Sequence, residues 1–261
     1  LFMKQESFDI FGNIVIVKFQ KGVKLGEKKK FALKFLKENK SVKTVLEKTG
    51  KFSGRLRKQK TKYIAGEKTK EALYRENGCV FRLNVDDVYF SSRLSNERKE
   101  IAKKVKNGDK VLVMFAGAAP YPIVIARDSR AKVVYSNEIN REANKYAELN
   151  IGLNKVNGRV VLLPGDIKRV AQKVKEKFDV IVMPRPQLKD MFLREAFSLS
   201  KKGTRIYYYD FCKEDEIKGI VNKIKSEALK SKKKIKILKI KKAGEIAPYK
   251  FRIRVDFVVL G

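Results

Sequence analysis

The chain has 261 residues, carries 62 lysines and arginines against 29 aspartates and glutamates, and has a formal net charge of +33 at pH 7. This length can bury the core of one large domain or of two modest ones, and the lack of any run of about twenty apolar residues excludes a transmembrane helix. So basic a chain attracts polyanions, which favours nucleic acid as its partner. A hot habitat can also enrich lysine, but it usually enriches glutamate as well.

Two cysteines, Cys79 and Cys212, lie far apart in the sequence, and histidine is absent. These counts exclude a disulfide framework and a Cys/His zinc site, and we expect no metal centre. Without imidazole, a general base must be another side chain. The few cysteines and the lack of a secretory signal predict a cytoplasmic protein.

Residues 1–92 have the pattern of a small α+β domain. Alternating apolar residues predict strands at 8–11 and 14–19, joined by a Gly-Asn turn. Apolar residues at helical spacing predict helices over 31–38 and 41–49, with a glycine closing the second helix. Shorter elements complete the region: a helical turn at 71–75 and strands at 79–85 and 87–90.

A basic segment, KFSGRLRKQKTKYIAGEKTK, occupies residues 51–70 with aromatic residues interleaved. Arginine and lysine supply affinity for phosphates, so the segment predicts a surface that contacts an RNA backbone. The alternative is a pair of charged, solvated strands. The candidate contacts are Arg55, Arg57, Lys58 and Lys60.

A second domain, 93–261, begins with a helix expected over 93–106, which joins the two domains. From Lys110 onward, strands alternate with helices, a pattern that predicts a mostly parallel sheet with helices on both faces. We expect strands at 111–115, 132–136, 159–163, 179–183 and 204–209, and helices at 121–126, 141–153, 167–175, 188–199 and 214–231. Two final strands, 233–241 and 251–260, form an antiparallel pair at the sheet edge.

The first strand of this domain runs directly into small residues, Ala116 to Ala119, and then into a helix. In an open α/β fold, this turn lies at the carboxyl end of the strand, where ligands bind. Small side chains let a ligand approach the backbone closely. An ordinary strand-to-helix turn is the alternative.

Further polar or rigid groups follow the next three strands. Glu138 ends the second strand about 20 residues after the turn, where doubly wound folds place an acid that binds ribose hydroxyls; a helix cap is the alternative. Asp166 follows the third strand, where it contacts an adenine amino group or caps the next helix. Pro184 and Pro186 make a rigid loop after the fourth strand, either a pocket wall or a tight turn.

The strand ends therefore predict a nucleoside pocket. No GxGxxG motif is present to cradle a pyrophosphate. A nucleoside ligand without phosphates fits better, and S-adenosylmethionine is such a ligand.

These motifs together resemble the archaeal and eukaryotic tRNA guanine-N1 methyltransferases, which modify the guanine at tRNA position 37. The segments that carry the resemblance are MFAGAAPYPIVIA at 114–126, NEIN at 137–140, NIGLNKV at 150–156, Gly165 with Asp166, and MPRP at 183–186. YFSSRLSNER at 89–98 resembles the interdomain motif of the family, and GRLR at 54–57 resembles its basic motif.

The resemblance implies a Rossmann-like class I methyltransferase domain preceded by a small α+β RNA-contacting domain. It implies S-adenosylmethionine as cofactor and tRNA as partner, with no membrane or metal involved, and we expect a monomer. Arg185 joins the expected RNA contacts. The expected cofactor contacts are Tyr89, Phe115, Ala116, Gly117, Ala118, Glu138, Ile139, Asp166, Ile167, Met183, Pro184 and Pro186.

By the same resemblance, Glu97 is the general base, Arg57 stabilises charge at guanine O6, and Arg93 positions the base or the substrate. Guanine N1 carries a proton at neutral pH, and a carboxylate in a partly apolar pocket, with its pKa raised, can remove it. Arg93 and Glu97 are four residues apart and share one helical face, so a surface ion pair is the alternative. Tyr89 either stacks on a base or closes the methionine end of the pocket.

Three positions depart from the family pattern. Val113 stands where the family commonly has an acid, Ala119 replaces the second glycine, and Pro184 stands at a usual asparagine. These departures leave two alternatives: an enzyme of wyosine-type tRNA modification, by methyl or aminocarboxypropyl transfer, and a catalytically inactive RNA-binding homologue.

Overall fold

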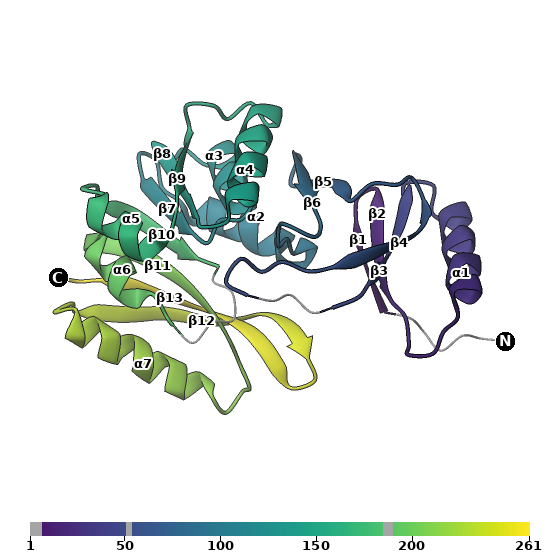
Figure 1. Ribbon diagram of the computed structural model, residues 1–261. Helices are drawn as coiled ribbons and strands as arrows, with labels where there is room; N and C mark the ends of the chain where they lie inside the picture. The colour runs from purple at the N-terminus through teal and green to yellow at the C-terminus, as the bar shows by residue number, and fades with distance from the viewer. Residues whose placement is uncertain (1–6, 51–53, 185–189) are drawn as a thin grey trace. The chain divides into compact units, whose positions relative to one another are not determined.

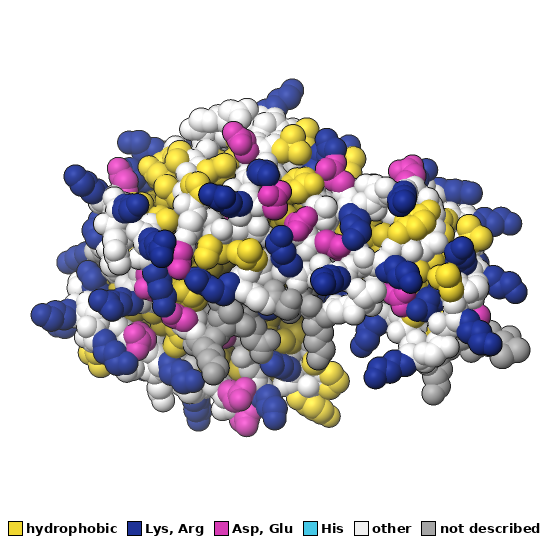
Figure 2. Space-filling view, viewed as in Figure 1, with side chains coloured by type: hydrophobic (Ala, Val, Ile, Leu, Met, Phe, Trp, Pro, Cys, Tyr) yellow, Lys and Arg dark blue, Asp and Glu magenta, His cyan; other side chains and the backbone are white. Residues whose placement is uncertain are grey.

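The computed structural model describes residues 7–50, 54–184 and 190–261. The chain divides into two compact units, Leu1–Ser92 and Arg93–Gly261 (Figure 1). Figure 2 shows lysine and arginine side chains spread over the visible face, with fewer acidic side chains among them. Among the described residues, no helix is long and apolar enough to cross a membrane.

The first unit contains a four-stranded sheet in the order β1-β2-β3-β4. Its strands are β1 (Ser7–Phe11), β2 (Ile14–Lys18), β3 (Thr44–Lys48) and β4 (Thr61–Gly66). Helix α1 (Leu25–Glu38) places Ala32 and Phe35 in a core with Val15, Val17 and Val45. A separate hairpin pairs β5 (Glu71–Glu76) with β6 (Cys79–Asn84).

Three expected elements of this unit are wrong. The helix over 41–49 is strand β3, which pairs in parallel with β2 and buries both Val45 and Leu46 completely. A strand covered on both faces has no alternation, so its apolar run imitates a helix. The helical turn at 71–75 is β5, and residues 87–90 form no strand.

The second unit is built on a seven-stranded sheet in the order β12-β13-β11-β10-β7-β8-β9. The five strands from β11 to β9 are parallel, and β13 runs antiparallel between β11 and β12. The strands are β7 (Lys110–Met114), β8 (Val133–Glu138), β9 (Val160–Pro164), β10 (Phe178–Met183), β11 (Ser200–Cys212), β12 (Ile235–Ala247) and β13 (Lys250–Val259). The order reverses between β7 and β10, which is the switch point where open α/β sheets bind ligands.

Helices cover both faces of this sheet, as expected. One face carries Leu112, Met114, Ile206 and Tyr208, which share a core with residues of α6 and α7. On the opposite face, the ring of Tyr121 in α3 contacts that of Tyr209, with centroids 6.2 Å apart. The helices are η1 (Ser92–Leu94), α2 (Ser95–Lys104), α3 (Pro120–Asp128), α4 (Arg141–Leu153), α5 (Ile167–Lys173), α6 (Leu193–Ser198) and α7 (Ile217–Lys230).

The α/β expectation for this unit is confirmed, including the antiparallel pair at the sheet edge. The helix expected over 188–199 is shorter: α6 begins at Leu193, after residues 190–192 that are not helical. The start of that expected helix lies outside the described residues, as do Arg185 and Pro186.

Candidate active site

The turn after β7 has an unusual backbone. Phe115, Gly117 and Ala119 have φ angles of 59°, 57° and 64°, all in the left-handed region. Only glycine adopts this region without strain, so the two other residues must be held by their surroundings. Ala118 and Ala119 are fully buried, and the side-chain amide of Asn150 in α4 donates a hydrogen bond of 3.1 Å to the Ala118 carbonyl.

Glu138, at the end of β8, completes this turn. Its two carboxylate oxygens accept backbone N–H groups, one from Gly117 at 2.8 Å and one from Asn140 at 2.8 Å. Burial raises the pKa of Glu138, and the backbone hydrogen bonds oppose that shift. A carboxylate has about four lone-pair sites. Glu138 therefore keeps acceptor capacity for hydroxyl groups of a ligand.

The ends of β8 and β9 are tied together. The side-chain amide of Asn137 donates to the carbonyls of Leu163, at 2.8 Å, and Gly165, at 3.0 Å. Asp166 follows and caps α5 by accepting the Lys168 N–H at 3.1 Å. The helix-cap alternative for Asp166 is therefore present in the structure, and a contact with adenine stays a prediction.

The other expected cofactor contacts of this unit lie at the same strand ends. The Phe115 ring packs on Phe192 with centroids 5.0 Å apart. Ile167 and Met183 are buried in the core, so they offer backbone rather than side chain to a ligand. Ile139 and Pro184 are half-buried.

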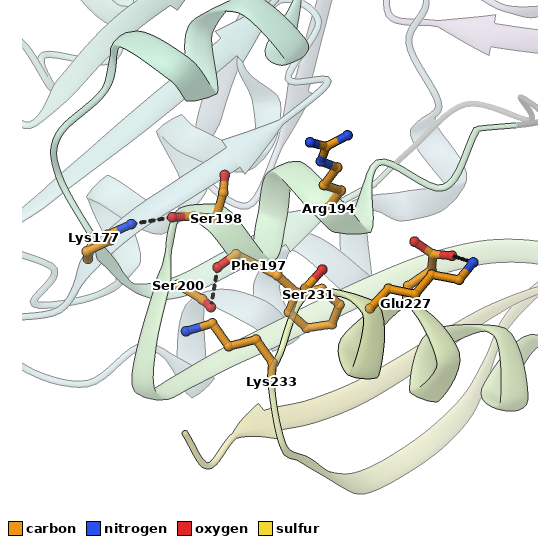
Figure 3. Close-up of a pocket in the computed structure, with 9 residues that line it drawn as sticks. Lys177, Arg194, Phe197, Ser198, Ser200, Glu227, Ser231 and Lys233 are labelled. Atoms are coloured by element: carbon orange, nitrogen blue, oxygen red, sulfur yellow. Dashed lines mark hydrogen bonds and ion pairs between the residues drawn. The ribbon is translucent and has the colours of Figure 1, made fainter.

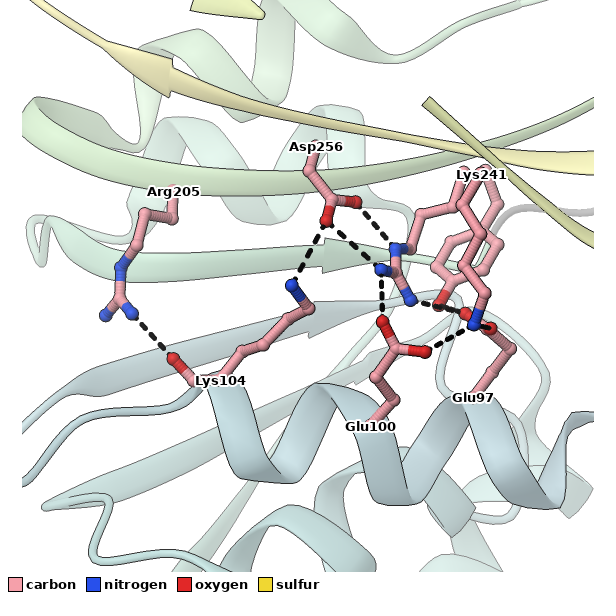
Figure 4. Close-up of polar contacts among 8 residues, drawn as sticks. Glu97, Glu100, Lys104, Arg205, Lys241 and Asp256 are labelled. Carbon is pink, nitrogen blue, oxygen red and sulfur yellow. Dashed lines mark hydrogen bonds and ion pairs between the residues drawn. The ribbon is translucent and has the colours of Figure 1, made fainter. Parts of the chain in front are cut away.

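Glu97 lies in the first turn of α2 and is only 4 % exposed. Its carboxylate accepts hydrogen bonds from the Tyr209 hydroxyl, at 2.9 Å, and from Arg254 Nη1, at 2.6 Å. It also forms an ion pair with Lys241 (Figure 4). The surface ion pair considered as an alternative is thus wrong for Glu97. The surroundings are also more charged than the partly apolar pocket that we expected.

Arg254 is the centre of a larger cluster. It is fully buried and also binds Asp256, through Nε at 2.6 Å, and Glu100, through Nη2 at 2.6 Å. Burial opposes the positive charge, but Asp256 and Glu100 outweigh it and raise the pKa of Arg254. Burial likewise acts to raise the pKa of Glu100, and the hydrogen bonds from Arg254 and Lys241 nevertheless lower it to about 2.

The cluster is held at the carboxyl edge of the sheet. Met183, the last residue of β10, pairs with Tyr208, and Tyr209 follows in β11. Tyr209 in turn pairs with Arg254 of β13. Glu97 therefore lies at the same edge as the turn after β7 and Glu138.

The other two expected catalytic residues, Arg93 and Arg57, belong to different units. Arg93 is exposed in η1, whereas Glu97 is buried, so the two differ in environment although they are four residues apart. In the first unit, the Arg57 guanidinium lies over the Tyr89 ring, 5.1 Å from its centroid. This contact is a cation–π interaction, and it orders two residues that the motifs singled out.

The expected RNA contacts of the first unit differ in their environments. Lys58 forms an ion pair with Asp87 at 2.9 Å. Arg55 and Lys60 are exposed. A phosphate would have to compete with Asp87 for Lys58.

Sequence reasoning missed Tyr209, Lys241 and Arg254, which hold Glu97. One signal was available: residues 252–257, Arg-Ile-Arg-Val-Asp-Phe, alternate charged and apolar side chains. In a strand flanked on both sides, as β13 is, such charges are buried and must find partners.

A cavity of about 680 Å³ lies elsewhere in the second unit (Figure 3). Lys177 precedes β10 and Ser200 begins β11, so the cavity is at the amino edge of the parallel strands. Ligands of open α/β folds bind at the opposite edge. Its lining residues are Lys177, Arg194, Phe197, Ser198, Ser200, Glu227, Lys230, Ser231 and Lys233.

Comparison with known protein families shows the family to which the chain belongs. The TRM5/TYW2 methyltransferase domain matches residues 72–238, more than half of the chain. The chain belongs to the TRM5/TYW2 methyltransferase family. The TYW2 N-terminal domain also matches residues 3–69. The family resemblance and the class I methyltransferase fold are thereby confirmed for this TRM5/TYW2 protein.

Two curated relatives are similar over most of this TRM5/TYW2 protein. The tRNA (guanine(37)-N(1))-methyltransferase Trm5b of Pyrococcus abyssi is 37% identical over 254 residues, which are 97% of this chain and 74% of the relative. The tRNA (guanine(37)-N(1))/4-demethylwyosine(37)-methyltransferase Taw22 of Nanoarchaeum equitans is 34% identical over 97% of this chain and 100% of the relative.

Three solved structures are similar to this chain over nearly its whole length. The crystal structure of Pyrococcus abyssi Trm5b has a TM-score of 0.86 and covers 98% of this chain and 75% of its own. A complex of aTrm5 with tRNALeu has a TM-score of 0.83 at 26% identity, covering 98% and 72% of the two chains. Methanocaldococcus jannaschii Trm5 bound to adenosine has a TM-score of 0.81 at 27% identity, covering 98% and 74%.

Proposed function

We propose that this protein transfers a methyl group from S-adenosylmethionine to N1 of the guanine at tRNA position 37. The observation that carries the proposal is the presence of two carboxylates, the buried Glu97 and the half-buried Glu138, at one edge of one sheet. Glu138 lies beside the small-residue turn and is suited to ribose hydroxyls, and Glu97 is the residue that the interdomain motif marks as the base.

The cofactor suits the strand ends. Glu138 keeps acceptor capacity for a ribose hydroxyl, and a nucleoside needs no pyrophosphate cradle. The turn brings little side-chain bulk, because it consists of Ala116, Gly117 and Ala118. Asp166 follows the end of β9 at the same edge of the sheet, where it can meet an adenine amino group. When bound, S-adenosylmethionine supplies a methyl group on a positively charged sulfur.

Glu97 acts on the other reactant. Its carboxylate takes the proton from guanine N1 as the N1–carbon bond forms and the carbon–sulfur bond breaks, with the sulfur keeping the electron pair. Tyr209, Lys241 and Arg254 fix the orientation of that carboxylate. Arg57 stabilises the charge that develops at O6, Arg93 positions the substrate, and Tyr89 stacks on a base or closes the pocket.

In this proposal the tRNA backbone is contacted by basic residues, supported by the net charge of +33: Arg55, Arg57, Lys58, Lys60 and Arg185. We further propose that the enzyme acts as a cytoplasmic monomer and that direct displacement needs no metal. Cys79 and Cys212 are buried and form no disulfide, which suits a reducing compartment.

The test uses an unmodified tRNA transcript with guanine at position 37. Incubation with S-adenosylmethionine, followed by digestion and mass spectrometry of the nucleosides, should yield N1-methylguanine. A matched transcript with adenosine at position 37 should yield none. Absence of N1-methylguanine from the first transcript would reject the proposal, and absence of any cofactor binding would favour an inactive RNA-binding homologue.

A second candidate is methylation of 4-demethylwyosine at the same position. The observation that favours it is the similarity to Taw22, whose name includes both substrates and which the chain matches along its whole length. Pro184, where the family usually has asparagine, would alter the wall that meets the base. A tRNA that carries 4-demethylwyosine tests this activity, and the mass added distinguishes a methyl from an aminocarboxypropyl group.

A further inference from the structure

The last two strands of the second unit form a long hairpin, coloured yellow in Figure 1. β12 and β13 pair from Ile235 with Val259 to Ala247 with Lys250, so Pro248 and Tyr249 form the tip. Tyr249 has a φ of 58°, in the left-handed region that favours glycine. A bulky side chain held there is unusual in a two-residue turn, where Asn or Gly is the common choice.

The tip extends past the carboxyl edge of the sheet. Val255 of β13 pairs with Tyr208, which is level with Met183 at the end of β10. Tyr249 precedes Val255 by six residues, which correspond to about 20 Å of extended strand beyond that level. The tip therefore projects on the side of the sheet where the turn after β7, Glu138 and Glu97 lie.

Tyr249 is 81 % exposed, the highest value among the large apolar side chains reported for the described residues. Lys250 follows it directly. Behind the tip, Lys242 lies over the Phe251 ring, 4.4 Å from its centroid, and Arg252 lies over Phe211 at 5.1 Å. An exposed aromatic ring beside basic side chains has the chemistry of a stacking platform for unpaired bases.

We infer that the tip of the β12–β13 hairpin contacts the substrate RNA, with Tyr249 stacking on an unpaired base and Lys250 contacting a phosphate. The inference rests on the proposed function, which brings RNA to the carboxyl edge. Because the tip lies about 20 Å beyond the end of β10, the stacked base belongs to an unpaired nucleotide other than the reacting one. The exposed lysines of β12 have the alternative role of preventing edge-to-edge pairing of sheets.

Binding of an anticodon stem-loop RNA to the full chain, measured by fluorescence anisotropy, tests the contact. Tyr249→Ala should weaken binding about 5- to 100-fold, and Tyr249→Phe should restore it to within about twofold, because stacking needs the ring and not the hydroxyl. Lys250→Gln should lower the slope of log affinity against log salt by about one.

The chain has no tryptophan, so a single introduced tryptophan reports its own surroundings. Tyr249→Trp should lose emission when the stem-loop is added. Leu229→Trp is the matched control: Leu229 is 74 % exposed in the same unit, near the end of α7, and β12 starts after it at the amino edge. The emission of the Leu229→Trp variant should not change when the stem-loop is added.

Unchanged RNA affinity in Tyr249→Ala, together with unchanged emission from Tyr249→Trp, would overturn the inference even if N1-methylguanine forms. Loss of affinity and of emission with a different modified nucleoside as product would reject the proposed function alone. A wild-type chain that does not bind the stem-loop would reject both.

Discussion

Two carboxylates of the second unit, the half-buried Glu138 and the buried Glu97, are held in opposite ways. Glu138 is fixed by backbone N–H groups from its own strand end and from the turn after β7. Glu97 is fixed by side chains from three strands, Tyr209 in β11, Lys241 in β12 and Arg254 in β13. Backbone donors carry no net charge, whereas the partners of Glu97 include two cations.

The difference matches two chemical roles, the binding of hydroxyl groups and the acceptance of a proton. A group that binds neutral hydroxyls needs free lone pairs in a fixed place, and backbone donors provide that with little dependence on side-chain identity. A group that accepts a proton needs a defined orientation, which Tyr209, Lys241 and Arg254 give to the buried Glu97. Substitutions at Glu97 and at Glu138 should therefore change different measured properties of the protein.

The largest effect is expected at Glu97. Glu97→Gln removes the proton acceptor but keeps the size of the side chain, and should lower single-turnover methyl transfer by about 10²- to 10⁴-fold. Glu100→Gln is the matched control, since it removes one charge from the same cluster without touching the proposed base. Equal rates in wild type and Glu97→Gln would remove Glu97 from the mechanism.

The next effect is on stability. Arg254→Met leaves Glu97 and Asp256 buried without their main cation and should lower the free energy of unfolding by about 3–5 kcal/mol. Lys242→Met, which breaks an exposed pair with Glu214, should cost no more than about 1 kcal/mol. Urea denaturation of both variants measures the contrast, and similar midpoints would mean that the cluster is not a stabilising unit.

Glu138→Gln should act on cofactor binding. Gly117 and Asn140 donate to different oxygens of Glu138, so in glutamine the amide NH₂ group would face one of these backbone N–H groups. We expect a loss of about 1–3 kcal/mol, or about 5- to 150-fold in the dissociation constant of S-adenosylmethionine, measured by calorimetry. Glu142→Gln, near the start of α4, is the control. Unaltered cofactor affinity in Glu138→Gln would remove Glu138 from the pocket.

Acid should loosen the Glu97 cluster. The pKa of Glu100 is about 2 in the fold, against 4.5 for the free side chain. A lowered carboxyl pKa stabilises the fold fully above about pH 4.5, and that contribution is lost as pH falls towards 2. Urea midpoints measured through this range should fall more steeply for wild type than for Glu100→Gln. Parallel curves would contradict the ion pairs of Glu100.

The smallest effect concerns the turn that holds Glu138. Ala119 is left-handed, so Ala119→Gly should relieve strain and raise stability by about 0.5–1 kcal/mol. Ala126→Gly, in the helical interior of α3, should instead lower stability by about 1 kcal/mol. Thermal unfolding compares the two, and a loss of stability in Ala119→Gly would show that packing of the methyl group outweighs the strain.

Much of the cofactor edge could be predicted from the sequence because it depends on local signals. An apolar strand, a turn of small residues and an acid after the next strand follow each other within residues 111–138, and all lie at strand ends. The apolar run of strand β3 has no alternation, so its pattern predicts a helix where the structure has a strand. Pairing with β2 and β4, not local preference, decides its structure.

Sequence alone determined the alternation of strands and helices, the excess of positive charge and the positions of Glu97 and Glu138 in their motifs. Only the tertiary structure decided what surrounds Glu97, because Tyr209, Lys241 and Arg254 are 112, 144 and 157 residues away in the chain. The register of β13 against β11 brings Arg254 beside Tyr209. It thereby places the charged side chain that contacts Glu97 in α2. Such a cluster depends on the pairing of distant strands, which no local pattern specifies.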